Sequence, residues 1–295
     1  RRRLPGVGDR EIHNVYANFR PAADWTYAEM EFEWPHPDTH NVEFGILIQL
    51  FTEYGTGGKI WIDDIRLSKP ASRVVEVIDR EPGFFYVGPS GDDRNEGTFW
   101  KPWRTLDYAV RQAIPGDTIV FLPGEYVGTL RPVRSGTADA PITFKALTRR
   151  TVRLVGGPGS EYAIHLSQVE HINIEGFHVA PDPHTGRWLL VDRARHIQIT
   201  DTLMEKARGS MPFLINNSEH VYVRDSVIRE YAGHNMARIS NSKWLLFEGN
   251  AISRTGHSPF QFYPPGSNQF IVVRGNVFHP AWGRAFEFFA ELDLL

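Results

Sequence analysis

The sequence contains no cysteine among its 295 residues. Disulfide bonds and zinc sites built from thiolates are therefore excluded. No apolar run approaches the roughly 20 residues that a membrane-spanning helix needs. Lysine is scarce, with 6 residues against 26 arginines, and the formal net charge is only -3. This near-neutral balance gives no electrostatic reason to expect nucleic acid or an anionic membrane surface as a partner.

The sequence repeats itself between about residues 162 and 289. Five segments align, and each alternates apolar and polar residues before it breaks at Gly, Asp or Asn. Their equivalent apolar residues are spaced 25, 24, 24 and 26 positions apart, at Ile172, Ile197, Val221, Leu245 and Ile271. A period of this size indicates a solenoid, and the alternation with β-branched residues indicates strands and turns. We therefore expect a parallel β-helix, because the leucine and asparagine spacing of leucine-rich repeats is absent.

A short helix is expected before the repeats. Thr105 suits the N-cap of a helix from Leu106 to about Ala113, which has one apolar stripe. Pro115 and Gly116 end this helix and lead into a strand over residues 118–122. Because a solenoid exposes its end strands and core, it needs a cap, and the helix is the candidate.

The run around this helix carries a family resemblance. It reads Phe85-Tyr-Val-Gly-Pro-Ser-Gly-Asp-Asp-Arg-Asn-Glu-Gly-Thr98, Lys101-Pro-Trp-Arg-Thr-Leu106 and Ile114-Pro-Gly-Asp-Thr-Ile-Val-Phe-Leu-Pro-Gly-Glu-Tyr126. Together with the period, it resembles the opening of bacterial right-handed parallel β-helix proteins of the pectate-lyase-like superfamily, over roughly residues 84–289. The resemblance implies a right-handed coil and activity on polysaccharides.

The first 70 residues predict a different, smaller β domain. Four strand patterns lie between Pro-, Asp- and Gly-rich turns, at residues 12–19, 27–34, 42–51 and 59–67. The last of these resembles the final strand of jelly-roll carbohydrate-binding modules, although a complete jelly roll needs eight strands. The resemblance implies a structural calcium ion near Asp63 and Asp64; the alternative is that both carboxylates face solvent or a turn.

The predicted fold is therefore all-β. It consists of a partial β-sandwich over residues 1–70, a linker over 71–83, and a right-handed parallel β-helix of about 24–26 residues per coil over 84–295 with an N-terminal capping helix. The start, without methionine or a signal core, looks like a processed or truncated end. The chain stops just after a coil has begun, so we expect a further chain segment or partner subunit to complete both the sandwich and the β-helix.

A second strand precedes each repeat segment and gives the coil a set of outward positions. Its inward pairs are Ile164/Leu166, Leu189/Val191, Phe213/Ile215, Ala237/Ile239, Phe260/Phe262 and Phe286/Phe288. Because side chains alternate along a strand, the residues between them form one outward column and those after them a second. The first column is His165, Leu190, Leu214, Arg238, Gln261 and Glu287, and the second is Ser167, Asp192, Asn216, Ser240, Tyr263 and Phe289.

The late coils gather the residue types that glycan chemistry uses. Candidate catalytic residues are His234, His257, Arg238, Arg284 and Glu287, and candidate substrate-binding residues are Gln261, Tyr263 and Trp282. Rings suit sugar stacking, and arginine forks suit carboxylates.

On a uronate polymer this patch could catalyse β-elimination. The reaction needs a base for the proton α to the carboxylate and a positive group for the resulting enolate. His234 or His257 is the candidate base, and Arg238 or Arg284 the candidate carboxylate ligand. The resemblance implies a lysine or arginine base and often calcium, and neither can be placed here.

Two other chemistries remain as alternatives. Hydrolysis needs two carboxylates about 5 to 9.5 Å apart, and Asp192 lies four coils from Glu287, so the second carboxylate would have to come from a turn or from outside this chain. The two histidines could bind a metal with Glu287, but no third ligand has a recognisable spacing, so we assign no metal site.

Several repeated polar residues have a structural explanation instead. Arg224, Glu248 and Arg274 occupy equivalent positions with alternating sign and predict an ion-pair ladder. Asn250 and Asn276 predict an asparagine ladder, and His171, His196 and His220 a structural strand-start column. The histidines of the candidate site also lie at turns, where they could serve only to satisfy backbone groups.

The sequence therefore favours a secreted protein, extracellular or on the cell surface, that acts on an acidic polysaccharide as a lyase-like enzyme. The alternative from another class is a non-catalytic structural, filament or adhesion protein with the β-helix as its scaffold. Polysaccharide is the expected partner in the first case, and the late-coil patch becomes a protein interface in the second.

Overall fold

The structure is a computed structural model of the chain. It describes residues 78–157, 161–181, 186–207, 211–231, 233, 235–255, 258–263 and 267–279, and the backbone of residues 286–288. The predictions for the first 70 residues, including the partial sandwich and calcium near Asp63 and Asp64, lie outside the described residues, as does most of the linker.

The described strands form three parallel sheets, which we call A, B and C. Sheet A contains β1 (Phe84–Val87), β2 (Thr118–Phe121), β4 (Ile142–Ala146), β7 (Glu170–Glu175), β10 (Arg195–Thr200), β13 (Glu219–Arg224), β16 (Lys243–Glu248) and β19 (Gln269–Arg274). Sheet B contains β3 (Gly124–Val127), β5 (Val152–Gly156), β8 (His178–Val179), β11 (Leu203–Glu205), β14 (Val227–Arg229), β17 (Ala251–Ser253) and β20 (Val277–His279). Sheet C contains β6 (Tyr162–Ser167), β9 (Arg187–Asp192), β12 (Phe213–Asn216), β15 (Asn235–Ser240), β18 (Ser258–Phe262) and β21 (Phe286–Phe288).

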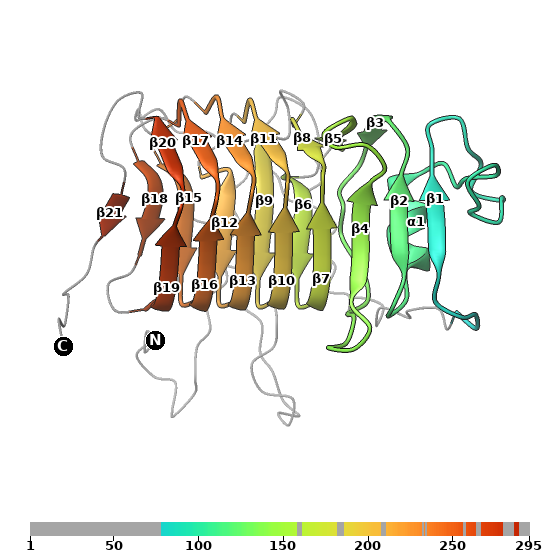
Figure 1. The fold of residues 1–295 in the computed structure, drawn as a ribbon, viewed down its shortest axis with the longest axis horizontal. Helices are drawn as coiled ribbons and strands as arrows, with labels where there is room; N and C mark the ends of the chain where they lie inside the picture. Colours follow the sequence, from blue (N-terminus) through green and yellow to red (C-terminus); the bar gives the residue numbers. More distant parts are fainter. Residues whose placement is uncertain are drawn as a thin grey trace, which may run out of the picture. The chain divides into compact units, whose positions relative to one another are not determined.

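Each regular coil gives one strand to each sheet, so the chain forms a parallel β-solenoid. Figure 1 shows β7, β10, β13, β16 and β19 side by side in sequence order. The predicted period is confirmed by the register, because Ile172 pairs with Ile197, and the pairing continues through Val221 and Leu245 to Ile271. A shift of one period along the sequence is therefore a shift of one coil in space.

The structure corrects the number of strands in a coil. The repeat segment predicts one strand and a turn, but its last residues form a separate short strand of sheet B. The break residue has a positive φ, as at Gly176 (79°), Asp201 (53°) and Gly249 (66°), and this left-handed backbone redirects the chain. The two or three residues that follow then pair with neighbouring coils.

The core is the interior of the solenoid. The inward positions predicted on the strands of sheet C are buried between Ile164 and Phe262, and they pair in the predicted register. Phe260 and Phe262 continue to β21 through backbone pairing with Phe286 and Phe288. Burial of one apolar side chain at each of these positions, worth about 1.5–3 kcal/mol, makes the alternation obligatory.

The predicted helix is confirmed as α1 (Leu106–Gln112). The Thr105 hydroxyl accepts a hydrogen bond of 3.1 Å from the backbone N–H of Tyr108, as an N-cap should. Leu106, Ala109 and Val110 are buried within the apolar core. Its apolar stripe therefore packs onto the same interior that the strands enclose.

The asparagine ladder is also confirmed, at the turn between sheets A and B. Asn250 is only 1% exposed, and its Oδ1 accepts from the N–H of Ser226 at 3.0 Å. Its Nδ2 donates to the carbonyl of Val223 at 2.9 Å, and its own N–H donates to Oδ1 of Asn276 at 2.9 Å. Each turn thus satisfies a buried backbone donor of the coil before it.

Rows of paired side chains line the outer face of sheet A. Glu248 accepts from Arg274 at 2.6 Å and lies 3.5 Å from Arg224, which confirms the predicted ion-pair ladder. At the strand starts, consecutive rings stack 4.4, 4.7, 6.0 and 4.0 Å apart through His171, His196, His220, Trp244 and Phe270. The three histidines therefore belong to a stacked structural column.

Replacing Asn250 by alanine should destabilise the solenoid by about 1–3 kcal/mol, because the buried N–H of Ser226 and carbonyl of Val223 in the preceding coil lose their partner. Urea unfolding followed by circular dichroism measures the loss. The matched control is Asn173→Ala on the outer face of sheet A, where one bond of 3.2 Å to Thr143 is lost from a half-buried side chain. The control should stay within about 0.5 kcal/mol, and equal losses would contradict a ladder role for Asn250.

Candidate functional site

The first outward column of sheet C is present in the predicted register. Arg238 of β15 pairs with Gln261 of β18, which pairs with Glu287 of β21. Leu190 and Leu214 precede Arg238 in the same column, so the polar part begins at β15 as the sequence predicts. The three coils from β15 to β21 therefore bring an arginine, an amide and an acidic position into line.

Arg238 is held by two neighbours. Its Nε donates to Oε1 of Gln261 at 3.2 Å, and its guanidinium carbon lies 5.1 Å from the ring centroid of Tyr263. Gln261 is only 7% exposed, whereas Tyr263 is 43% exposed. Gln261 therefore differs from the solvent-facing residue that the outward column predicts, because Arg238 lies against it. The amide orients the guanidinium, and the ring of Tyr263 stays accessible.

The side chains of the other five candidate site residues lie outside the described part of the structure. His234, His257, Trp282 and Arg284 lie outside the described residues, and only the backbone of Glu287 is described. Their roles stay predictions. What the structure brings together is Arg238, Gln261 and Tyr263.

A second cluster of charged residues, which the sequence pattern does not predict, lies on sheet B. We call it the Glu205 cluster: His178, Glu205, Lys206 and Arg229. Nε2 of His178 lies 3.0 Å from Oε1 of Glu205. Oε2 of Glu205 accepts a hydrogen bond of 2.8 Å from Nε of Arg229 and lies 2.7 Å from Nη2 of the same ion-paired guanidinium. Nζ of Lys206 lies 3.7 Å from Oε1. The Glu205 side chain is 6% exposed, so three basic side chains surround one nearly buried carboxylate.

The cluster was missed because the strands of sheet B were not predicted. Glu205 ends β11 and pairs with Arg229 of β14, while His178 reaches it from β8 on the other side. A signal did exist, since Arg229 follows Glu205 by 24 residues, which is one period. His178 is not at the equivalent position, because it pairs with Leu203.

The surroundings favour the charged form of Glu205 and the neutral form of His178. Burial alone would raise the pKa of Glu205, but the hydrogen bond from Arg229 and the neighbouring positive charges outweigh it and hold the pKa below its ordinary value. Burial lowers the pKa of His178, against the charge and hydrogen bond of Glu205, and Arg153 and Lys206 lower it further. At neutral pH the pair is therefore a carboxylate and a neutral imidazole that donates through Nε2.

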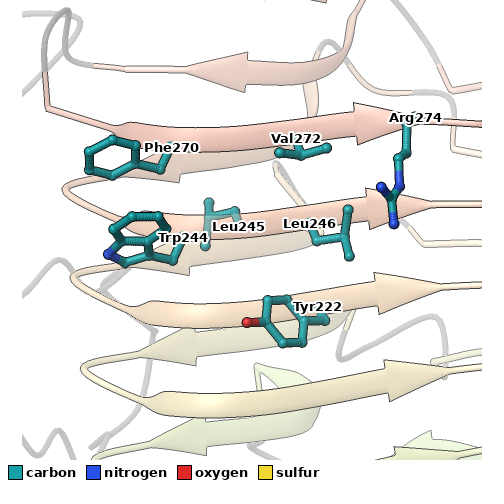
Figure 2. A pocket seen from close by; sticks show the side chains of 7 residues that line it. All are labelled: Tyr222, Trp244, Leu245, Leu246, Phe270, Val272 and Arg274. Atoms are coloured by element: carbon teal, nitrogen blue, oxygen red, sulfur yellow. The ribbon is translucent and has the colours of Figure 1, made fainter.

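A shallow depression of about 200 Å³ lies elsewhere, on the outer face of sheet A. Figure 2 shows its lining from β13, β16 and β19: Tyr222, Trp244, Leu245, Leu246, Phe270, Val272 and Arg274. Trp244 and Phe270 lie against each other, and Arg274 points toward the preceding coil, where it meets Glu248. Its lining is mostly apolar and offers no acid and base pair, so we do not place chemistry there.

Two further findings bear on ligands and membranes. Over the described ranges, no three His, Asp or Glu side chains come together in a way that could hold a metal ion. No helix in that same part of the chain has the length and apolar character needed to cross a membrane.

The class that the fold defines is a parallel β-solenoid with three sheets. No family model matches the chain. Two curated proteins match short stretches of it. An uncharacterized protein of Bacillus subtilis, YwoF, is 42% identical over 73 residues, which is 25% of this chain and 16% of that protein. Pectate lyase PEL9 of Emericella nidulans is 37% identical over 73 residues, which is 24% of this chain and 18% of that protein. The matches thus span less than a fifth of either relative.

Solved structures with similar solenoids have low sequence identity. The lacto-N-biosidase of family GH136 from Eubacterium ramulus has a TM-score of 0.48 at 14% identity, covering 61% of this chain and 43% of that one. Pectate lyase Pel9A has a TM-score of 0.43 at 15% identity, covering 62% and 59%. Likenesses of this size concern the fold and carry no information on the reaction.

The Glu205 cluster predicts a pH effect on stability. An unfolded His178 binds its proton at the ordinary pKa of about 6.5, whereas the folded protein binds it only at lower pH. The unfolded state thus takes up more protons between pH 7 and 5, and stability falls as the pH falls. The variant His178→Gln should lose less stability over this window than the unmodified protein, as measured by urea midpoints at both pH values. An equal or larger loss in the variant would contradict the lowered pKa.

Proposed function

We propose that the chain acts on an acidic polysaccharide by β-elimination, on the outer face of sheet C around Arg238. The observation that carries the proposal is the arrangement of Arg238, Gln261 and Tyr263, in which a fixed guanidinium lies beside an accessible ring. The stretch that is 37% identical to a pectate lyase supports the same class of substrate. The parallel solenoid supplies a long, regular face on which a polymer chain can lie.

The geometry of Arg238 suits a uronate carboxylate. Its Nε is engaged by Gln261, and within the described residues no partner is recorded for Nη1 or Nη2. Two N–H groups of one guanidinium can bind a carboxylate as a fork. As the proton α to that carboxylate leaves, negative charge spreads onto the carboxylate oxygens, and the fixed cation stabilises this charge in the transition state.

The remaining steps fall to residues predicted from the sequence. His234 or His257 takes the proton on the carbon α to the carboxylate, and the electron pair forms the new carbon–carbon double bond. The bond from the β carbon to the glycosidic oxygen breaks, and that oxygen leaves with a proton from solvent or from Glu287. Arg284 is a second carboxylate ligand, and Trp282 and Tyr263 stack on neighbouring sugars.

The wider organisation forms part of the same proposal. The coil is right-handed, α1 caps its N-terminal end, and the first 70 residues form part of a carbohydrate-binding sandwich with a calcium ion near Asp63 and Asp64. The protein is secreted and works outside the cell or at its surface.

The proposal predicts that ultraviolet absorbance of an unsaturated product appears with a uronate polysaccharide in a panel of acidic and neutral polymers. The variant Arg238→Ala should lower kcat/KM by about a hundred- to a thousandfold, because the transition state loses its charge partner. The control Arg195→Ala removes a half-exposed arginine of sheet A and should leave kcat/KM unchanged. Absence of product with every polymer would refute the enzyme and favour the scaffold alternative.

A second prediction tests the base. One of the variants His234→Ala and His257→Ala should lose most of its kcat and flatten the acidic limb of the pH profile of kcat/KM. Lyase activity that survives both substitutions would exclude this base assignment while leaving the reaction class intact. Reducing sugar released without the unsaturated product would instead indicate a hydrolase, with its second carboxylate outside this chain.

A further inference from the structure

The Glu205 cluster takes no part in the reaction proposed at Arg238, yet residues from several coils meet in it around one carboxylate. Its members come from three successive coils of sheet B and from the turn that follows β11. His178 and Arg229 are held by hydrogen bonds to the same carboxylate, and Nζ of Lys206 lies 3.7 Å from it. The cluster faces outward, because the core positions on these strands are Val179, Met204 and Ile228.

The two cationic members, Arg229 and Lys206, keep donors after their contact with Glu205. Arg229 uses Nε and Nη2, and no partner of Nη1 is recorded among the described residues. Nζ of Lys206, at 3.7 Å, is too far away for a hydrogen bond, so its donors remain available. His178 uses Nε2, and Nδ1 has no recorded partner in the same part of the chain. Arg229 and Lys206 thus keep donors for an anionic ligand, while the neutral His178 offers only an acceptor at Nδ1.

The charge of the cluster is unbalanced. Lys206 and Arg229 are permanent cations, Glu205 supplies one negative charge, and His178 adds a third positive charge when it is protonated. The neighbouring Arg153 is already paired with Glu125. The side chains of Arg229 and Lys206 are 43% and 65% exposed, so the surplus positive charge faces solvent. It does so in a protein whose formal net charge is -3.

We infer that the Glu205 cluster is a second binding site, on the outer face of sheet B, for the carboxylate groups of an acidic polysaccharide. The inference rests on the proposed function for the class of ligand. A carboxylate of the polymer accepts from the donors of Arg229 and Lys206 that Glu205 does not use. The negative charge of Glu205 lowers the affinity, because it partly neutralises the same two cations. A bound polymer would thereby have a contact on a face separate from Arg238, which raises its effective concentration at the proposed reaction site.

Galacturonate as a monosaccharide tests this site without turnover, because it contains no glycosidic bond to cleave. The probe is added to the full chain while the imidazole proton resonances of His178 are followed by NMR, and galactose is the neutral control. Galacturonate should shift the His178 resonances in a saturable way, and galactose should not. No shift, or an equal shift with both sugars, would overturn the inference.

Two substitutions should move the affinity in opposite directions. Lys206→Gln removes a cation and should weaken galacturonate binding by roughly two- to fivefold, the range of an exposed ion pair. Glu205→Gln removes the competing carboxylate and should strengthen binding by a similar factor. The control Lys243→Gln removes a lysine that also lies beside a carboxylate, Glu219, on sheet A. It should have no effect.

A purely structural ion-pair network predicts a different pattern. In that case Lys206→Gln behaves as Lys243→Gln does, and Glu205→Gln lowers stability without any gain in affinity; either result would overturn the site. Should Glu205→Gln fail to fold, Lys206→Gln and the His178 resonances still decide. Failure of the lyase assay leaves these binding results unaffected, and lyase activity with no binding at Glu205 refutes only the second site.

Discussion

Parallel backbone pairing between coils, kept in one register from β7 to β19 in sheet A, is the constraint on which the other features depend. It places residues about one period apart in direct contact, as with Ile172, Ile197 and Val221 in sheet A. Neighbouring strands lie about 4.8 Å apart, so any side chain repeated with the period meets its copies. Apolar copies form the core, alternating charges form ion-pair rows, and aromatic copies stack. Where equivalent positions on consecutive coils carry different polar side chains, as at Arg238 and Gln261, a candidate binding site results.

The two charged sites illustrate this rule in different ways. Arg238 and Gln261 are equivalent residues on consecutive coils, so the guanidinium meets an amide side by side. In the Glu205 cluster, His178 approaches from one coil and Arg229 from the other. A buried carboxylate would be costly without such partners, and its removal from water is offset by charge-assisted hydrogen bonds from both sides. The same stacking therefore creates an accessible guanidinium in sheet C and a saturated carboxylate in sheet B.

The fold was predictable where burial dictates residue type. The inward positions must be apolar, so the period, the strand register and the start of the column at Arg238 follow from the pattern. The N-cap at Thr105 was equally predictable, because a capping hydrogen bond involves only residues close together in the sequence. The strands of sheet B were not predictable from the sequence. A strand of two or three residues, such as His178–Val179, is too short to show an alternation of apolar and polar residues. The burial of Gln261 depends on where its neighbour's side chain lies, and the Glu205 cluster depends on strands that the pattern does not reveal.

The asparagine ladder has a direction. The N–H of Ser226 is satisfied by Asn250, and the N–H of Asn250 by Asn276, so each coil is completed by the coil that follows it in the sequence. The backbone amide in each of these turns therefore depends on a side chain that lies one period later in the sequence. An interruption of the chain between two such turns would leave the amide of the earlier one without its partner.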